Sequence, residues 1–98
     1  GILFNVIQMG ELLKQRLAVI PNVKFVRQYG LMIAIEFTDN IDPTAVGQII
    51  KKMNEQGILI LTCGNQGQYV RILPPLNISN HECATFLEIF THIVSEFD

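Results

Sequence analysis

The order of apolar and polar residues along the chain predicts an alternation of amphipathic helices and short strands. In three stretches the apolar residues recur every three or four positions, which is typical of helices with one buried face. These stretches are residues 3–18, residues 43–56 and the segment that follows Ser79. Between them lie short apolar runs bounded by turn residues, which predict strands. The predicted strands are residues 23–28, 31–37, 58–61 and 69–73.

Capping residues set the boundaries of two of these helices. Asp42 before Pro43 predicts a helix start, because an aspartate can cap the first turn and proline suits the first helical position. Gly57 is placed to end that helix in the left-handed conformation. Ser79 and Glu82 have the spacing of a capping box. The second and third helices are therefore predicted to begin at defined residues.

The first strand pair is predicted to be antiparallel and to turn at Gly30. Strict alternation would place Val23 and Phe25 on one side of the first strand and Lys24 on the other. The second strand, residues 31–37, is almost continuously apolar, which favours a central position in the sheet. Glu36 is the exception in that run, and we expect it on the solvated face or at the strand end.

The second strand pair carries the most informative residue, Arg71. The predicted strands Ile58–Leu61 and Tyr69–Leu73 are joined by a predicted loop, Thr62–Gln68. Arg71 stands between Val70 and Ile72, and a guanidinium is rare in such apolar sequence unless an anion meets it. From the residues alone, that anion is either a ligand or a structural partner, Glu36 or Glu55.

The element order, helix, two strands, helix, two strands, helix, predicts an α+β fold. We expect a small, mainly antiparallel sheet of about four strands with the helices on one face. The whole chain, residues 1–98, is predicted to form a single domain, because 98 residues leave no room for two.

Composition narrows the class of partner. A hydrophobic share of 49% with 16% charged residues fits either a well-filled core or a surface that another domain covers. The formal net charge of −2 gives no electrostatic reason to expect nucleic acid or an anionic membrane, and no apolar run approaches the ~18 residues of a membrane span. Cys63 and Cys83 show neither zinc-site spacing nor a disulfide framework, so we expect free thiols, no metal and a cytoplasmic location.

Two segments resemble class III pyridoxal-phosphate aminotransferases, most of all the 4-aminobutyrate aminotransferases. Tyr29–Phe37 reads YGLMIAIEF and is similar to the family's GLMxGIEF segment. Gly57–Ile78 reads GILILTCGNQGQYVRILPPLNI and resembles the segment GLLLxxCGxxGNVIRxLPPLxI. With the flanking helices, the resemblance covers essentially the whole chain. Ala34 stands in place of the usual glycine, and Gln68-Tyr69 in place of Asn-Val.

The resemblance implies that this chain is the small C-terminal domain of a longer enzyme. The first helix has no starting methionine or capping signature before Ile2, which agrees with that interpretation. The large domain would bind pyridoxal phosphate through a lysine that no segment here resembles. We therefore expect no catalytic residue in this chain, no tight cofactor binding and no transamination by the chain alone.

Arg71 is the residue to which the resemblance assigns a role, that of gripping a substrate carboxylate. A planar guanidinium matches a carboxylate with two parallel hydrogen bonds and stays charged at any working pH. Cys63 and Gly64 are predicted to form a tight loop with a buried thiol, or alternatively the rim of the substrate pocket.

The implied reaction is transfer of an amino group from an ω-amino acid such as 4-aminobutyrate to a 2-oxo acid. The implied partners are the large cofactor-binding domain, the two substrates and further copies of the intact enzyme in a homo-oligomer. The alternative is a stand-alone, non-enzymatic α+β module that binds a carboxylate ligand or a protein.

Overall fold

The computed structural model describes residues 2–30, 32–57, 61–63, 69–74 and 78–97. Its elements are α1 (Ile2–Leu17), β1 (Val23–Tyr29), β2 (Met32–Phe37), α2 (Pro43–Gln56), β3 (Leu61–Cys63), β4 (Tyr69–Ile72) and α3 (Asn80–Ser95). The strands form a 4-stranded sheet in the order β1-β2-β4-β3, and every neighbouring pair is antiparallel. The α+β class, the element order and the antiparallel sheet are therefore confirmed.

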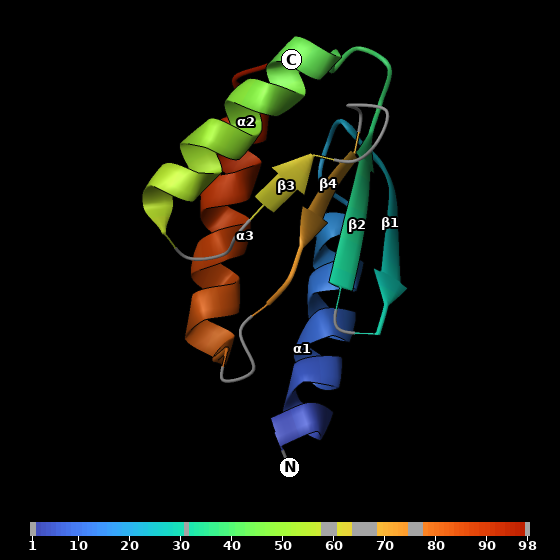
Figure 1. Cartoon of the computed structure of the whole chain (residues 1–98), viewed down its shortest axis with the longest axis vertical. Coiled ribbons are helices and arrows are strands. Elements are labelled where there is room, and N and C mark those ends of the chain that lie inside the picture. The colour runs from blue at the N-terminus through green and yellow to red at the C-terminus, as the bar shows by residue number, and fades with distance from the viewer. Residues whose placement is uncertain (1, 31, 58–60, 64–68, 75–77, 98) are drawn as a thin grey trace.

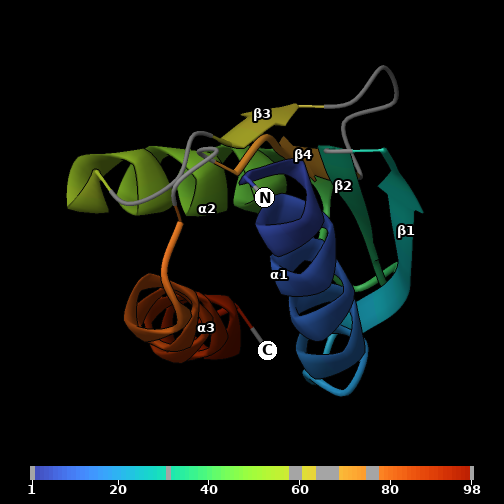
Figure 2. The same cartoon turned by 90° about the horizontal axis from the view of Figure 1, so that it is seen from below.

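The three helices lie on one face of the sheet, and no helix or strand that the structure describes covers the other face (Figures 1 and 2). Helix α1 packs against β1 and β2, and α2 packs against β3 and β4. Helix α3 contacts both of the other helices and completes the helical layer. We call the face that meets the helices the inner face of the sheet and the opposite one the outer face.

The core lies between the inner face and the helices. Phe90 of α3 stacks on Phe37 of β2 with 6.2 Å between ring centroids, and on Phe86 with 5.5 Å. These rings join the third helix to the central strand of the sheet. The buried apolar residues are Leu13, Leu17, Ile20, Ile33, Ile35, Phe37, Ile41, Val46, Ile49, Met53, Val70, Ile72, Ile78, Cys83, Phe86, Phe90, Ile93 and Val94.

The predicted caps are present. The Asp42 carboxylate accepts a hydrogen bond from the Ala45 backbone N–H at 2.8 Å, and Gly57 ends α2 with a φ of 71°. Ser79 and Glu82 form a reciprocal capping box at the start of α3. These local bonds satisfy backbone donors that a helix start otherwise leaves unpaired. The bounds predicted for α2 agree with the structure.

The predicted loop Thr62–Gln68 is wrong at its first two residues. Thr62 and Cys63 belong to β3, where Thr62 pairs with Arg71 and Cys63 with Val70. Pairing with β4 satisfies their backbone groups, and that long-range gain outweighs the loop preference suggested by the nearby glycines. Residues 58–60 and 64–68 lie outside the described part of the chain.

The alternation predicted for β1 is wrong at its start. The register shifts between Val23 and Phe25, as in a β-bulge, so that Val23 pairs with Phe37 while Phe25 pairs with Glu36. Cross-strand partners share a face, and Phe37 and Glu36 point to opposite faces of β2. Val23 therefore lies on the inner face and Phe25 on the outer face, with Lys24 as the extra residue between them.

Gly10 marks a close approach of α1 to β1. A Cβ atom built on Gly10 would lie 2.6 Å from Nε2 of Gln28. The lack of a side chain at Gly10 thus leaves room for Gln28, whose polar side chain is half-buried on the inner face. Within the described residues, no helix is both long and apolar enough to cross a membrane.

Candidate functional site

Arg71 lies on the outer face of the sheet, in its central part. Its register partner on β2 is Ala34, whose partner on β1 is Arg27, and its partner on β3 is Thr62. These residues form one row across all four strands, the sheet order being β1-β2-β4-β3. Within this row the small residue Ala34 lies between two guanidinium-bearing residues, Arg27 and Arg71.

The period of the strand explains how Arg71 is accommodated between apolar neighbours. Successive residues of a strand point to opposite faces, so Val70 and Ile72 enter the core while Arg71 does not. Val70 and Ile72 are both 0% exposed, whereas Arg71 is half-buried on the uncovered side. Arg71 is therefore accommodated on the outer face, although its neighbours in sequence are apolar and buried.

Glu36, the other charged residue of the central strands β2 and β4, is already paired. Its Oε2 lies 3.5 Å from Nζ of Lys24, the bulge residue of β1. Its register partner is Tyr69 of β4. A hydrogen bond from the Tyr69 hydroxyl to Glu36 and the negative charge of Glu36 both raise the pKa of Tyr69, while nearby Arg27 acts in the opposite direction. Lys24, Glu36 and Tyr69 therefore form one polar cluster on the outer face.

Neither structural partner considered for Arg71 is observed. Within the described ranges, no carboxylate oxygen lies within 4.0 Å of the Arg71 guanidinium, and Glu36 bonds to Lys24 instead. Glu55 lines a groove between α2 and α3, on the helical side of the molecule. A half-buried guanidinium on an open face, next to a polar cluster that is internally paired, can accept an incoming carboxylate.

The surroundings of Arg71 are basic and partly apolar. Phe25 is 50% exposed and Tyr29 is 56% exposed, both on the outer face of β1, and Leu73 just after β4 is 63% exposed. Lys24 Nζ and Arg27 Cζ lie 5.8 and 5.7 Å from the centroid of the Phe25 ring. Exposed aromatic rings beside cations are typical of surfaces that another molecule covers.

The structure tests the other two predicted pocket residues only in part. Cys63 ends β3 opposite Val70, one position along from the pairing of Thr62 with Arg71. Gly64 lies outside the described residues. The role of Cys63 and Gly64 as a pocket rim stays a prediction.

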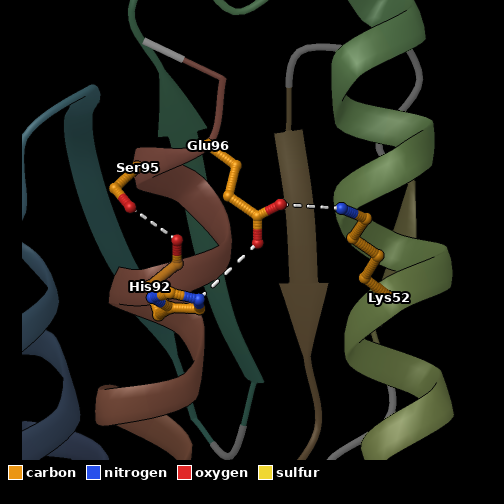
Figure 3. A network of polar contacts seen from close by, with 4 residues as sticks. All are labelled: Lys52, His92, Ser95 and Glu96. Carbon is orange, nitrogen blue, oxygen red and sulfur yellow. Dashed lines mark hydrogen bonds and ion pairs between the residues drawn. The ribbon is translucent and has the colours of Figure 1, made fainter.

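A second polar network lies between α2 and α3 (Figure 3). Lys52 Nζ donates to Glu96 Oε2 at 2.9 Å, and His92 Nε2 lies 3.9 Å from the other oxygen of the same carboxylate. The hydrogen bond and the charge of Lys52 lower the pKa of Glu96. The adjoining groove of about 510 Å³ is open, and three of its lining residues, Lys52, His92 and Glu96, already contact one another. It shows no feature that selects a ligand.

Histidines and cysteines add no further chemistry to the described structure. His81 and His92 are both exposed on α3. Cys83 is buried with its Sγ 3.9 Å from Sδ of Met9, and burial raises the pKa of its thiol. No cluster of metal-ligating side chains occurs among the residues that the structure describes.

Comparison with known proteins identifies the family. Residues 2–94 match the family model described as aminotransferase class-III. A 4-aminobutyrate aminotransferase of Mycobacterium leprae is 38% identical over 76 residues, which cover 74% of this chain and 17% of that protein. An acetylornithine aminotransferase of Haemophilus ducreyi is 31% identical over 94 residues, covering 96% of this chain and 22% of that protein. The chain therefore belongs to the class III aminotransferases, a pyridoxal-phosphate-dependent family.

Solved structures show the same fold. The N-acetylornithine aminotransferase of Stenotrophomonas maltophilia K279a superposes with a TM-score of 0.78 at 25% identity, over 95% of this chain and 26% of that one. The ornithine aminotransferase of Plasmodium yoelii gives a TM-score of 0.69 at 33% identity, over 93% of this chain and 23% of that one. The chain thus spans about a quarter or less of the length of these relatives.

Proposed function

We propose that this chain is the small C-terminal domain of a longer aminotransferase and that Arg71 binds a carboxylate of its substrates. The observation that carries the proposal is the position of Arg71 on the uncovered outer face, with no carboxylate within 4.0 Å among the described residues. A guanidinium in that position can bind a carboxylate through two parallel hydrogen bonds when a substrate arrives.

The residues that the structure describes do not fit pyridoxal phosphate by themselves. A helix N-terminus is the usual backbone site for a phosphate group. The N-termini of α2 and α3 are instead filled by the Asp42 and Glu82 side chains, both acidic. Lys24, which lies beside the outer face, is paired with Glu36. The cofactor would therefore be held by the large domain, and no chemical step is assigned to this chain.

What this chain contributes is orientation. Holding the substrate carboxylate at a fixed point restricts where its amino group can lie, and correct orientation accounts for a large part of many enzymatic accelerations. The exposed Phe25 and Tyr29 beside the site fit a surface that closes against the large domain and excludes water.

The proposed reaction transfers an amino group from an ω-amino acid such as 4-aminobutyrate to a 2-oxo acid. Proteins similar to this chain include 4-aminobutyrate, acetylornithine and 5-aminovalerate aminotransferases. Each of these three amino acids carries a carboxylate, which a single arginine can bind. We propose that the intact enzyme is a homo-oligomer located in the cytoplasm.

The alternative function is a stand-alone module that binds a carboxylate ligand or a protein without catalysis. The same outer face supports it, because Arg71 and its aromatic neighbours would serve either role. The two functions differ in what adjoins the chain. A coding sequence that continues in frame upstream of Gly1 into a cofactor domain with its lysine supports the enzyme, and an in-frame stop codon there contradicts it.

The direct test uses the gene product that contains this chain. We expect Arg71→Gln to lower kcat/KM for 4-aminobutyrate by about ten- to hundredfold, because hydrogen bonds to a charged group are worth about 1.5–3 kcal/mol. Arg16→Gln, an exposed arginine on α1, is the matched control and should leave kcat/KM unchanged. Equal activity of the Arg71→Gln and wild-type proteins would contradict the carboxylate role.

A further inference from the structure

Glu36 lies close enough to Arg71 to compete with a substrate for it. Glu36 pairs with Tyr69 and Arg71 pairs with Ala34, so Glu36 and Arg71 are diagonal neighbours on one face of adjacent strands. Diagonal neighbours lie about 7–8 Å apart at their Cα atoms, within reach of two long side chains. An ion pair between them would occupy the guanidinium and oppose the binding of any other carboxylate.

The structure shows Glu36 bonded elsewhere. The Glu36 side chain is 21% exposed and faces Lys24 Nζ at 3.5 Å, and it also takes a hydrogen bond from Tyr69. Tyr69 lies in the same row as Glu36, and Lys24 is next to Phe25, the other member of that row. Neither partner belongs to the row that contains Arg71, and Lys24 lies on the far side of Glu36 from that row. Glu36 thus has two competing partners, one a cation and one a neutral donor.

The bulge in β1 is what brings Lys24 to this position. Without the register shift between Val23 and Phe25, residues would alternate strictly and Lys24 would point to the face opposite that of Phe25. Bulges re-aim side chains in this way next to functional sites. With the shift, Lys24 Nζ reaches both the Phe25 ring, at 5.8 Å, and Glu36.

We propose that Lys24 and Tyr69 are positioning residues that hold the Glu36 carboxylate away from Arg71 and so keep its guanidinium free for a carboxylate ligand. The inference rests on the proposed function of Arg71 and names how that function is protected. In this interpretation the bulge of β1 serves to bring Lys24 to Glu36. When both Lys24 and Tyr69 are replaced, Glu36 should pair with Arg71 and compete with a carboxylate ligand.

The first experiment observes the Arg71 side chain in the 98-residue chain by NMR, through its Nε–Hε resonance. In the otherwise wild-type chain, Glu36→Gln should leave this resonance in place, because the two side chains are not paired. In the Lys24→Met/Tyr69→Phe chain the resonance should shift and its hydrogen exchange should slow. Adding Glu36→Gln to that double variant should return the resonance to its wild-type position.

The second experiment measures kinetics in the gene product that contains this chain. Lys24→Met/Tyr69→Phe should raise KM for 4-aminobutyrate about two- to fivefold with kcat unchanged, the range expected for competition by one exposed ion pair. Glu36→Gln added to the double variant should restore KM. Lys51→Met, an exposed lysine on α2, is the control and should have no effect.

Two outcomes overturn the inference: a shift of the Arg71 resonance on Glu36→Gln alone, or no shift in the Lys24→Met/Tyr69→Phe chain. Failure of the proposed function is distinct, since it would appear as an unchanged KM in Arg71→Gln. In that case the NMR comparison still decides whether Lys24 and Tyr69 restrain Glu36.

Discussion

The two faces of the sheet are built from alternate residues of the same strands and have opposite character. On the inner face, Ile33, Ile35 and Val70 are at most 1% exposed and meet the helices. On the outer face, Glu36 and Arg71 alternate with them in sequence and remain accessible. The fold is thus held from one side only, and the other side is free to carry charge.

This difference explains why an arginine can stand in an apolar sequence at small cost. Apolar burial stabilises a fold by about 25 cal/mol per Å² removed from water, and here nearly all of it occurs on the inner face. A charged residue on the outer face gives up little of that stabilisation and avoids the penalty of a buried, unpaired charge. Stability therefore resides on the inner face and the proposed recognition on the outer face, a separation that substitutions can test.

The largest expected contrast is between two phenylalanines. Phe90→Ala should lower the free energy of unfolding by about 3–5 kcal/mol, because it removes a buried ring that stacks on Phe37 and Phe86. Phe25→Ala on the outer face should cost less than about 1 kcal/mol, the scale of an exposed cation–π contact. Urea unfolding followed by circular dichroism measures both. Similar losses in the two variants would contradict the one-sided core.

A sharper contrast uses adjacent residues of β4. Ile72→Ala should destabilise the chain by about 2–5 kcal/mol, since Ile72 is fully buried on the inner face. Arg71→Gln should change the free energy of unfolding by no more than about 0.5 kcal/mol, as for other surface substitutions. The same urea titration measures the free energy of unfolding of both variants. A loss above about 2 kcal/mol in Arg71→Gln would mean that the arginine is structural.

The smallest expected effect concerns Tyr69, whose pKa Glu36 raises. A raised pKa in the folded state means that the associated stability is present below the ordinary tyrosine pKa of about 10 and is lost as pH rises through the folded value. Glu36→Gln should lower the pKa of Tyr69, which NMR titration of its ring resonances measures. It should also weaken the alkaline loss of stability. An unchanged Tyr69 pKa in this variant would remove Tyr69 from the polar cluster.

Local signals in the sequence predicted the fold well. The bounds of α2 follow from Asp42, Pro43 and Gly57, whose caps act within one helical turn. Glu36, expected on the solvated face or at the strand end, lies on the outer face of β2. Arg71 could be singled out from the sequence alone, because it is a charged residue between apolar neighbours.

Long-range pairing decided what the sequence could not show. Nothing in the residues 23–28 reveals the register shift, so the approach of Lys24 to Glu36 was not predictable. Likewise, Thr62 and Cys63 read as loop residues and become a strand only because β4 pairs with them. The half-burial of Gln28 depends on Gly10, eighteen positions earlier and on another element. Each of these features depends on a partner that is distant in sequence.

We propose that this chain holds half of a site, with Arg71 on the outer face as its carboxylate-binding residue. The most direct measurement is a two-dimensional NMR titration of the 98-residue chain with 4-aminobutyrate and with glutamate, beside Arg71→Ala. We predict a folded chain with no saturating shift below about 10 mM, because one exposed ion pair contributes only about 0–1 kcal/mol. Saturation in the micromolar range that Arg71→Ala abolishes would contradict this account and show that the chain is a complete binding module.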